Sequence, residues 1–339
     1  MRILIVRIGR AGDIVMTTPA INALLDCYPD AEFTLLTSPD GKRLLRHYSP
    51  LVVDTWVWDR AALTAGLQKI KIKQKVSGTN FDKIFCFETS PSIAKPFNDS
   101  SAQLYQPEYN DELIHSSRLY LNMVKKSCNA EIDQYYASLP VTDDAISKVN
   151  RELQNIGIDD NDIVVAMHPT FSGFSRFSFI KKNARKNKLW PAERFAELGI
   201  KLSRHTLNNG KHPVVIIDLL EPEAALGNKI TKLSSGKIKL LTEPPNMERY
   251  KALLKRADLL ISPDTGPMHI AAAVNTRIVA LFSGKSPADC GPYMPDDRFI
   301  TIQAENMPGP QTGIKAITVD SVYDACLKQI STIESLDTL

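Results

Sequence analysis

Short apolar runs alternate along the chain with longer stretches in which apolar residues recur every three or four positions. The runs predict buried β-strands and the longer stretches predict amphipathic helices. The predicted strands are residues 3–8, 32–37, 52–57, 81–87, 163–167, 213–218, 237–241, 258–261 and 277–282. The predicted helices are residues 18–27, 42–48, 63–76, 113–124, 145–153, 191–202, 224–233, 247–255, 268–274 and 319–330. Residues 88–115 follow neither pattern.

The alternation of strand and helix begins near the N-terminus. It begins again after a polar, proline-containing stretch at residues 137–143. Strands that alternate with helices predict an α/β fold whose sheets are mostly parallel and covered on both faces. We therefore predict two Rossmann-like domains, residues 1–155 and 156–318, followed by a last helical segment at 319–339. In such sheets ligands bind beyond the carboxyl ends of the strands.

The turn after the strand at 258–261 has the composition of an anion site. Asp264 and Thr265 are good N-cap residues, Gly266 lets a ligand approach the backbone, and Pro267 suits a first helical turn. The N–H groups and the positive end of the helix dipole then face whatever lies before the helix. A phosphate site and an ordinary capped helix both fit this pattern.

Other segments carry further polar residues at turns after strands. These four segments are Gly12-Asp13, His168-Pro169-Thr170, Lys188-Leu189-Trp190-Pro191 and Cys290-Gly291-Pro292-Tyr293. Together with Asp264-Thr265-Gly266-Pro267-Met268-His269, they resemble the ADP-heptose:lipopolysaccharide heptosyltransferases, glycosyltransferase family 9. The resemblance runs from residue 2 to about residue 293, and each motif alone is weak.

The resemblance implies an enzyme, an inverting glycosyltransferase of the GT-B class. Its two Rossmann-like domains face each other across a central cleft. The N-terminal domain would bind the acceptor, the lipopolysaccharide core with its lipid A, and the C-terminal domain the donor, ADP-heptose. In this family the last helix, here 319–339, often crosses back to the N-terminal domain. The resemblance implies that Lys188 does what a metal does in other glycosyltransferases, so we expect no metal and no cofactor besides the donor substrate.

The resemblance assigns Asp13 as the catalytic base that deprotonates the acceptor hydroxyl. The alternative is that Asp13 only caps the helix after it. Arg7, Arg10 and Gly12 surround it in sequence and are expected to contact the acceptor. Family members often have Lys at the position of Arg7, and a planar guanidinium and a compact ammonium bind anions differently. A strand-end surface cation is the alternative for Arg7.

The donor site is expected to consist of side chains and backbone from the C-terminal domain. Its predicted members are Thr170, Lys188, Glu221, Asp264, Thr265, Gly266 and His269. Lys188 would neutralise phosphate, and an acid after the strand at 213–218 would contact the ribose. For that acid Glu221 is favoured and Glu223 remains open. His269 is alternatively a packing residue and Lys188 a solvated one.

The connection at residues 171–187 is long for the family and rich in cations and phenylalanines, with no acid. Lys181, Lys182 and Arg185 are therefore predicted to contact the anionic acceptor or a membrane surface. The alternative is a solvated connection.

Composition narrows the partners and the cellular compartment that fit this chain. A formal net charge of +3 gives no argument for nucleic acid, and the five cysteines are odd in number and scattered, which fits free thiols in a reducing compartment. The N-terminal apolar run is too short for a signal peptide, and no stretch approaches the roughly 20 apolar residues of a membrane span. We expect a cytoplasmic monomer at the cytoplasmic face of the inner membrane, in peripheral contact with it.

Competing functions remain open. A nicotinamide oxidoreductase requires Gly-x-Gly-x-x-Gly after the first strand, and the chain has only Gly9 and Gly12 there. A nucleotide-sugar-binding protein without catalysis, or a family member that uses another nucleotide sugar, fits the same motifs. The sequence specifies neither the sugar nor the core position that receives it.

Overall fold

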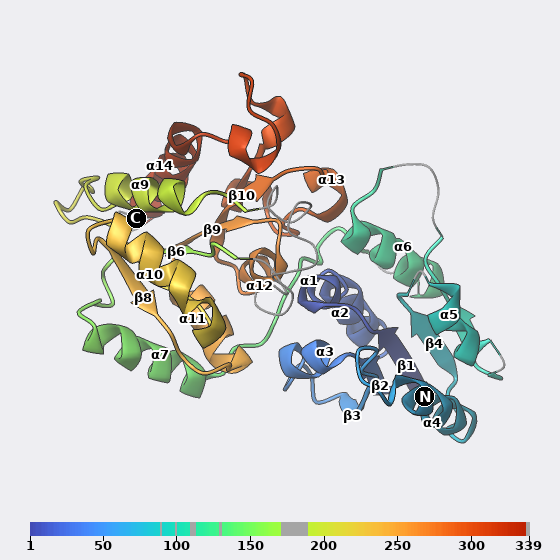
Figure 1. Ribbon diagram of the computed structural model, residues 1–339. Helices are drawn as coiled ribbons and strands as arrows, with labels where there is room; N and C mark the ends of the chain where they lie inside the picture. Colours follow the sequence, from blue (N-terminus) through green and yellow to red (C-terminus); the bar gives the residue numbers. More distant parts are fainter. Residues whose placement is uncertain (89, 99, 109–112, 129–130, 171–188, 337–339) are drawn as a thin grey trace. The chain divides into compact units, whose positions relative to one another are not determined.

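The computed structural model describes residues 1–339 except 89, 99, 109–112, 129–130, 171–188 and 337–339. The chain forms two compact units, Met1–Pro140 and Val141–Leu339 (Figure 1). Each unit is an α/β domain built on one parallel sheet, as the alternating sequence pattern predicts. No helix in the described part of the chain combines the length and apolar character that crossing a membrane requires.

The first unit contains five strands and the helices between them. Its strands are β1 (Arg2–Arg7), β2 (Glu32–Thr37), β3 (Val52–Val57), β4 (Lys83–Cys86) and β5 (Gln103–Tyr105). Its helices are α1 (Ala11–Val15), α2 (Thr18–Cys27), α3 (Pro39–Leu44), α4 (Ala65–Ser77), α5 (Pro91–Ala94), the 3-10 turn η1 (Lys95–Phe97) and α6 (Ser116–Cys128). The strand order is β3-β2-β1-β4-β5, all parallel.

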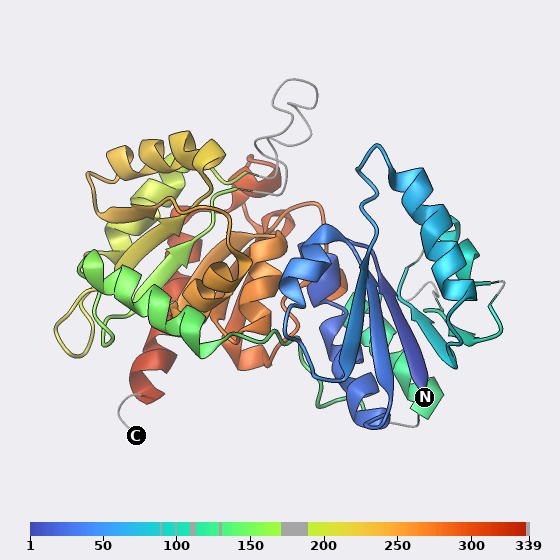
Figure 2. The ribbon, with the colours of Figure 1, turned by 90° about the horizontal axis from the view of Figure 1, so that it is seen from below.

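Strand alternation divides the core of this unit into two layers. Leu4 and Val6 of β1 lie in one apolar cluster with Ile72 and Val76 of α4, while Ile3 and Ile5 are buried on the other side. Successive strand residues point to opposite faces, so one six-residue strand supplies both layers. α2 packs against α6, and Figure 2 shows α2 and α4 on opposite faces of the sheet.

The second unit contains a six-stranded parallel sheet. Its strands are β6 (Val164–Met167), β7 (Val214–Asp218), β8 (Ile238–Leu241), β9 (Leu259–Pro263), β10 (Arg277–Phe282) and β11 (Phe299–Gln303). Its helices are α7 (Asp143–Asn155), α9 (Ala192–Leu202), α10 (Ala224–Leu233), α11 (Met247–Arg256), α12 (Gly266–Ala273), α13 (Pro287–Cys290) and α14 (Val319–Leu336), with 3-10 turns at Glu221–Glu223, Asp296–Arg298, Ala304–Asn306 and Gly313–Ala316. The strand order is β11-β10-β9-β6-β7-β8.

The two sheets share one topology. In each, the first strand of the unit pairs on one side with the second strand and on the other with the fourth. Strands two and three are added on one side of the first strand and the fourth on its other side. The point between the first and fourth strands, where this order reverses, is where doubly wound sheets bind their ligands. The relevant neighbours are β1 and β4 in the first unit and β6 and β9 in the second.

Two boundaries differ from the sequence prediction. The compact units meet at 140/141 and not at 155/156, because α7 packs along α11 and Arg249 of α11 pairs with Glu152 of α7. The structure assigns the last helix, α14, to the second unit, so it does not set the described part of 319–339 apart as a segment of its own. The helix packs on α9 and on β9, β10 and β11, and its Val322, Cys326 and Ile330 join the core of the second unit.

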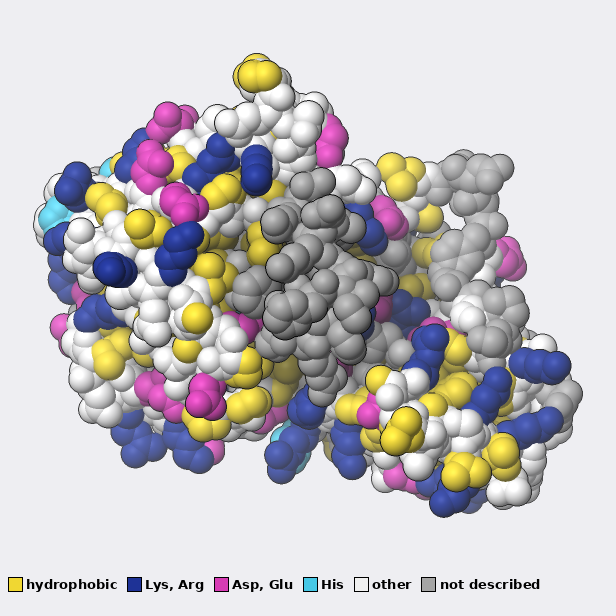
Figure 3. Space-filling view, viewed as in Figure 1, with side chains coloured by type: hydrophobic (Ala, Val, Ile, Leu, Met, Phe, Trp, Pro, Cys, Tyr) yellow, Lys and Arg dark blue, Asp and Glu magenta, His cyan; other side chains and the backbone are white. Residues whose placement is uncertain are grey.

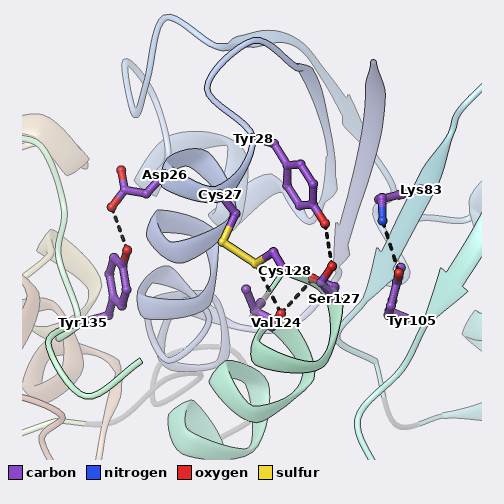
Figure 4. Close-up of a disulfide and its surroundings, with 9 residues drawn as sticks. All are labelled: Asp26, Cys27, Tyr28, Lys83, Tyr105, Val124, Ser127, Cys128 and Tyr135. Carbon is purple, nitrogen blue, oxygen red and sulfur yellow. Dashed lines mark hydrogen bonds between the residues drawn. A yellow bond between two sulfur atoms is a disulfide. The ribbon is translucent and has the colours of Figure 1, made fainter. Parts of the chain in front are cut away.

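The expectation of free thiols is wrong for two of the five cysteines. Cys27 and Cys128 form a disulfide between the carboxyl ends of α2 and α6, and their Cα atoms lie 6.1 Å apart (Figure 4). Next to it the Tyr28 hydroxyl donates to the Ser127 carbonyl at 3.0 Å. The two cysteines are 101 residues apart in sequence, so spacing alone gave no sign that these helix ends meet. Cys86, Cys290 and Cys326 are free and buried. The cysteines therefore no longer support a reducing compartment.

The revised boundary predicts the stability of isolated fragments. A fragment of residues 141–339 should unfold cooperatively, whereas one of residues 156–339 should be less stable by several kcal/mol. The shorter fragment loses the buried Val149 and Leu153 of α7, at about 1.5–3 kcal/mol each, and leaves Arg249 without Glu152. Urea unfolding of both fragments measures the difference. Equal stability would place the boundary back at 155/156.

Candidate functional site

The carboxyl ends of β1 and β4 bring together the polar residues of the first unit. Arg7 ends β1, and its guanidinium crosses to the neighbouring strand end, where Nη1 donates to the Phe87 carbonyl at 2.6 Å. The Arg7 guanidinium carbon lies 5.3 Å from the centre of the Tyr120 ring on α6, a cation–π contact. Only 11% of the Arg7 side chain is exposed.

Asp13 lies within the first turn of α1, where its carboxylate has two neighbours. Oδ2 accepts from the backbone N–H of Arg10 at 2.9 Å, and Oδ1 is 3.4 Å from Arg7 Nη2. Arg10, and not Asp13, is the N-cap residue of α1, so the predicted capping alternative is met in a modified form: Asp13 closes the first turn from its third position. With 41% of its side chain exposed, the carboxylate remains open to a ligand.

Gly9 is the residue that makes room for this carboxylate. A Cβ at position 9 would lie 2.3 Å from Asp13 Cβ and 2.8 Å from Asp13 Oδ2. Any side chain there would displace Asp13. The close approach to Asp13 therefore requires glycine at position 9. Of the other predicted residues here, Arg10 is exposed and Gly12 is half-buried in α1.

Glu88 completes the group and was missed from the sequence. It lies two residues after the end of β4, and only 8% of its side chain is exposed. Oε1 accepts from the Ile8 backbone N–H at 2.5 Å and lies 3.8 Å from Arg7 Nη1. The signal that could have found it is an acid just after the strand that pairs with β1. Arg7 thus stands between two carboxylates, one buried and one exposed.

The second unit repeats this arrangement between β6 and β9. The His168 backbone N–H donates to the Ile261 carbonyl at 2.9 Å, which joins the two strand ends. Thr265 caps α12 in an extended conformation, with its hydroxyl turned inward to Ser262 Oγ at 3.0 Å and the Pro263 carbonyl at 3.2 Å. Pro267 has no N–H and the Met268 N–H donates to the Thr265 carbonyl at 3.1 Å, so these two positions of α12 have no amide to offer a ligand.

The other predicted members of this turn differ in exposure. Asp264 and Gly266 are half-buried, while Thr265 is buried. His269 is 5% exposed, and every residue of α12 from Met268 to Ala273 is buried. The turn after β9 thus has the strand, cap and helix start expected from the sequence.

Thr170, Glu223 and His168 form a small polar cluster beyond β6. The Thr170 hydroxyl is 3.1 Å from His168 Nε2 and is also hydrogen-bonded to the Glu223 carboxylate. Burial lowers the pKa of His168 to about 4, so its ring is neutral near pH 7. Burial likewise raises the pKa of Glu223, and the Thr170 bond opposes that rise. Among the described atoms, His168 Nδ1 is buried without a hydrogen-bond partner.

The structure separates the two candidate acids after β7. Glu223 faces Thr170, whereas Glu221 is exposed at the start of the same 3-10 turn. Of the two, Glu223 is the one joined to another predicted donor residue.

A buried ion cluster next to these residues was not predicted. Arg249 of α11 donates to both Asp218 oxygens at 3.0 and 3.1 Å and also pairs with Glu152 of α7. Burial raises the pKa of Asp218 to about 6, with Glu152 and Glu243 adding to the effect against the attraction of Arg249. The single Arg249 guanidinium is shared by Asp218 and Glu152, which is consistent with a raised pKa of Asp218.

Four predicted residues, Lys181, Lys182, Arg185 and Lys188, lie outside the described residues. Within the described ones, no group of three or more His, Cys, Asp and Glu side chains is placed to hold a metal ion.

Comparison with known proteins relates this geometry to a family. The sequence pattern of "Glycosyltransferase family 9 (heptosyltransferase)" matches residues 115–314, more than half of the chain. The chain belongs to glycosyltransferase family 9. The matched region covers α6 and most of the second unit, including the His168, Glu223 and Asp264 turns.

Curated relatives carry heptosyltransferase names. Lipopolysaccharide heptosyltransferase 3 of Escherichia coli is 23% identical over 292 residues, which span 80% of this chain and 79% of that protein. Lipopolysaccharide core heptosyltransferase OpsX of Haemophilus influenzae is 27% identical over 138 residues, 40% of this chain and 39% of the relative. This second match thus spans about two fifths of that protein's length.

Solved structures agree on the fold. The glycosyl transferase family 9 protein from Veillonella parvula superposes with a TM-score of 0.80 at 16% identity, covering 98% of this chain and 97% of that one. Escherichia coli heptosyltransferase WaaC with ADP gives a TM-score of 0.71 at 14% identity over 97% of this chain and all (100%) of that one. This family-9 enzyme therefore has the GT-B fold of two Rossmann-like domains.

The position of Glu88 predicts a measurable role in this family-9 enzyme. Glu88→Gln keeps an oxygen for the Ile8 N–H but removes the charge that faces Arg7, so Arg7 should shift toward Asp13. We expect kcat to fall about 10- to 100-fold, the range for small misplacements of a catalytic group, with the donor KM nearly unchanged.

The chain offers a matched control for this variant. Asp82 accepts from the Arg2 backbone N–H at 2.7 Å and so joins the same two strands at their opposite ends. Asp82→Asn makes the same charge change and should leave kcat unaltered. Equal losses in both variants would mean that Glu88 only stabilises the sheet.

The raised pKa of Asp218 predicts a pH dependence of stability. Between its ordinary pKa near 3.8 and about 6, the folded state binds the proton more tightly than the unfolded state. The free energy of unfolding contributed by Asp218 should therefore fall as pH rises through this window, by at most about 3 kcal/mol. Urea unfolding of wild type and Asp218→Asn between pH 4 and 7 isolates this term as the difference in slope. Parallel pH profiles would contradict the assignment.

Proposed function

We propose that the chain transfers heptose from ADP-heptose to the inner core of lipopolysaccharide, with inversion and without a metal ion. Family membership supports heptose transfer, and the curated relatives' names supply the acceptor class. The single observation that carries the proposal is the state of Asp13: its carboxylate is half-exposed and oriented at the turn between β1 and α1. A half-exposed carboxylate in this position can accept a proton from a bound hydroxyl in addition to closing the first turn of α1.

In the proposed reaction Asp13 acts as a general base. Its carboxylate takes the proton from an acceptor hydroxyl as that oxygen attacks the anomeric carbon of the donor. The carbon–oxygen bond to the diphosphate breaks and ADP leaves with the electron pair. Attack opposite to the leaving group inverts the anomeric centre. Arg7 beside Asp13 holds the carboxylate in place through its Nη2 contact.

Stabilising the charge that develops on the departing ADP is the task assigned to the second unit. The N-terminus of α12, at Thr265 and Gly266, presents backbone N–H groups and the positive end of the helix dipole. Preorganised donors of this kind are commonly the largest electrostatic contribution to transfer reactions. Lys188 is proposed to neutralise the same diphosphate in place of a metal, and His269 to donate a hydrogen bond to it.

The remaining residues are likewise assigned either to the donor or to the acceptor. Thr170 is proposed to contact the donor, and Glu223, hydrogen-bonded to it, replaces Glu221 as the preferred partner of the ribose. Asp264 is assigned to a donor hydroxyl. Arg10, Gly12 and the loop cations Lys181, Lys182 and Arg185 remain assigned to the acceptor. We propose that the enzyme works at the cytoplasmic face of the inner membrane, where it would reach a lipid-anchored acceptor.

Transfer assays with Asp13→Asn test the proposal. Wild type should release ADP from ADP-heptose only when a core acceptor is present, and Asp13→Asn should lose about 10²–10⁴-fold in kcat. ADP affinity should stay within a few-fold, because Asp13 belongs to the first unit and the proposed donor residues to the second. Retention of more than about a third of kcat would exclude Asp13 as the base.

Two further outcomes separate the competing functions. Nucleotide-sugar binding without turnover in wild type would favour a binding protein. Turnover with another nucleotide sugar, but not with ADP-heptose, would keep the enzyme class and change the donor.

A further inference from the structure

Helix α4 carries apolar side chains on two opposite faces. Ile72 and Val76 are buried against the sheet of the first unit. Leu67 and Ile70, together with Leu63 just before the helix, are 64%, 57% and 107% exposed. We call Leu63, Leu67 and Ile70 the outer stripe. Their spacing of four and three residues places them on one side of a helix, turned away from Ile72 and Val76.

The surroundings of the outer stripe are strongly basic. Lys69, Lys71, Lys73 and Lys75 alternate along α4, and the sequence has no acid from residue 60 to residue 81. Lys71, Lys73 and Lys75 are exposed. Lys71 and Lys75 come to one side of the outer stripe and Lys73 to the other, because each residue turns the helix by about 100°. In Figure 3, yellow and dark-blue side chains lie together over the region of α4.

Two lysines of α4 also contact residues of β3 and of the segment after it. The Lys75 ammonium lies 3.2 Å from Asp54 and 4.1 Å from the centre of the Trp56 ring, and Lys69 lies 5.9 Å from the Trp58 ring. The buried Ile72 and Val76 hold α4 on the sheet of the first unit. Leu67 and Ile70 are therefore presented by a packed helix, and Leu63 lies just before it.

We propose that the outer stripe and the lysines of α4 dock the first unit on an anionic phospholipid surface. Exposed leucine and isoleucine in a row are costly in water and gain free energy at the boundary between headgroups and acyl chains. Lysines at their sides are attracted by the negative lipid headgroups. A soluble polyanion would use the lysines but would leave the outer stripe uncovered. The charge and the apolar stripe together fit a lipid surface.

This proposal deepens the proposed function and rests on it for its purpose. An enzyme whose acceptor is anchored in a membrane by lipid A gains from lying on that membrane, because its acceptor site then meets the sugar at the surface. α4 has 13 residues, so it would lie in the interface and not cross it.

The docking is tested by sedimentation of the full-length protein with vesicles, without donor or acceptor. Wild type should sediment with vesicles that contain phosphatidylglycerol and not with vesicles of phosphatidylcholine alone, and added salt should weaken the binding. Leu67→Gln/Ile70→Gln should lower the partition coefficient by roughly tenfold or more. Lys71→Gln/Lys73→Gln should lower it by a similar factor. Gln keeps the helix, since its propensity is close to that of Leu and Lys.

The matched control is Leu113→Gln/Leu233→Gln, which removes two leucines that are 67% and 43% exposed elsewhere on the surface. It should bind vesicles within about twofold of wild type. Failure of wild type to bind the anionic vesicles, or an equal loss in the control, would overturn the proposal. So would loss of binding in the lysine variant with full binding in Leu67→Gln/Ile70→Gln, which would indicate a site for soluble polyanions. Thermal unfolding of each variant verifies that it is folded.

A second assay keeps this proposal distinct from the proposed function. With a water-soluble acceptor that lacks lipid, Leu67→Gln/Ile70→Gln should keep the wild-type kcat. Vesicle binding without any transfer by wild type would reject the function and leave the docking. Transfer to the soluble acceptor without vesicle binding would do the reverse.

Discussion

Parallel pairing between the first and fourth strands of each sheet is the constraint on which both candidate sites depend. Parallel strands end at the same edge, so the residues that follow two neighbouring strands must meet there. In the first unit this brings Arg7 and Ile8, after β1, to Glu88, after β4, although 80 residues separate Ile8 from Glu88. In the second unit it brings His168, after β6, to the end of β9. The polar residues are thus positioned by strand order before any ligand is bound.

The first of these sites shows how a buried charge can organise an exposed one. The Arg7 guanidinium is held by the Phe87 carbonyl, the Tyr120 ring and Glu88, so few conformations remain for it. It can then face Asp13 without losing much side-chain entropy, which is the usual cost of an ion pair at a surface. Gly9 adds the steric condition that the carboxylate can approach the turn. The arrangement gives Asp13 a fixed direction and leaves part of it accessible.

Much of the fold could be predicted from the sequence because buried parallel strands are short, continuous apolar runs. All nine predicted strands are present with ends that shift by a residue or two, and 32–37, 52–57 and 277–282 match their strands without change. The strands that were missed, β5 and β11, lie at sheet edges and are only half-buried or exposed, so their residues lack that pattern. The domain boundary was missed for another reason: α7 precedes its sheet in sequence, and only its packing on α11 assigns it to the second unit.

The candidate sites could be predicted only where a motif is local. Gly12-Asp13 and Asp264-Thr265-Gly266 are each contained in one turn, so the sequence displays them directly. Glu88, the Asp218–Arg249–Glu152 cluster and the Cys27–Cys128 pair depend on contacts between segments far apart in the chain. The outer stripe of α4 is an intermediate case. The lysines of α4 are evident in the sequence, but the apolar residues of the outer stripe cannot be distinguished there from the core residues Ile72 and Val76. Only the packed structure shows which apolar face covers the sheet and which one faces outward, and the outward face is the observation on which the proposed docking rests.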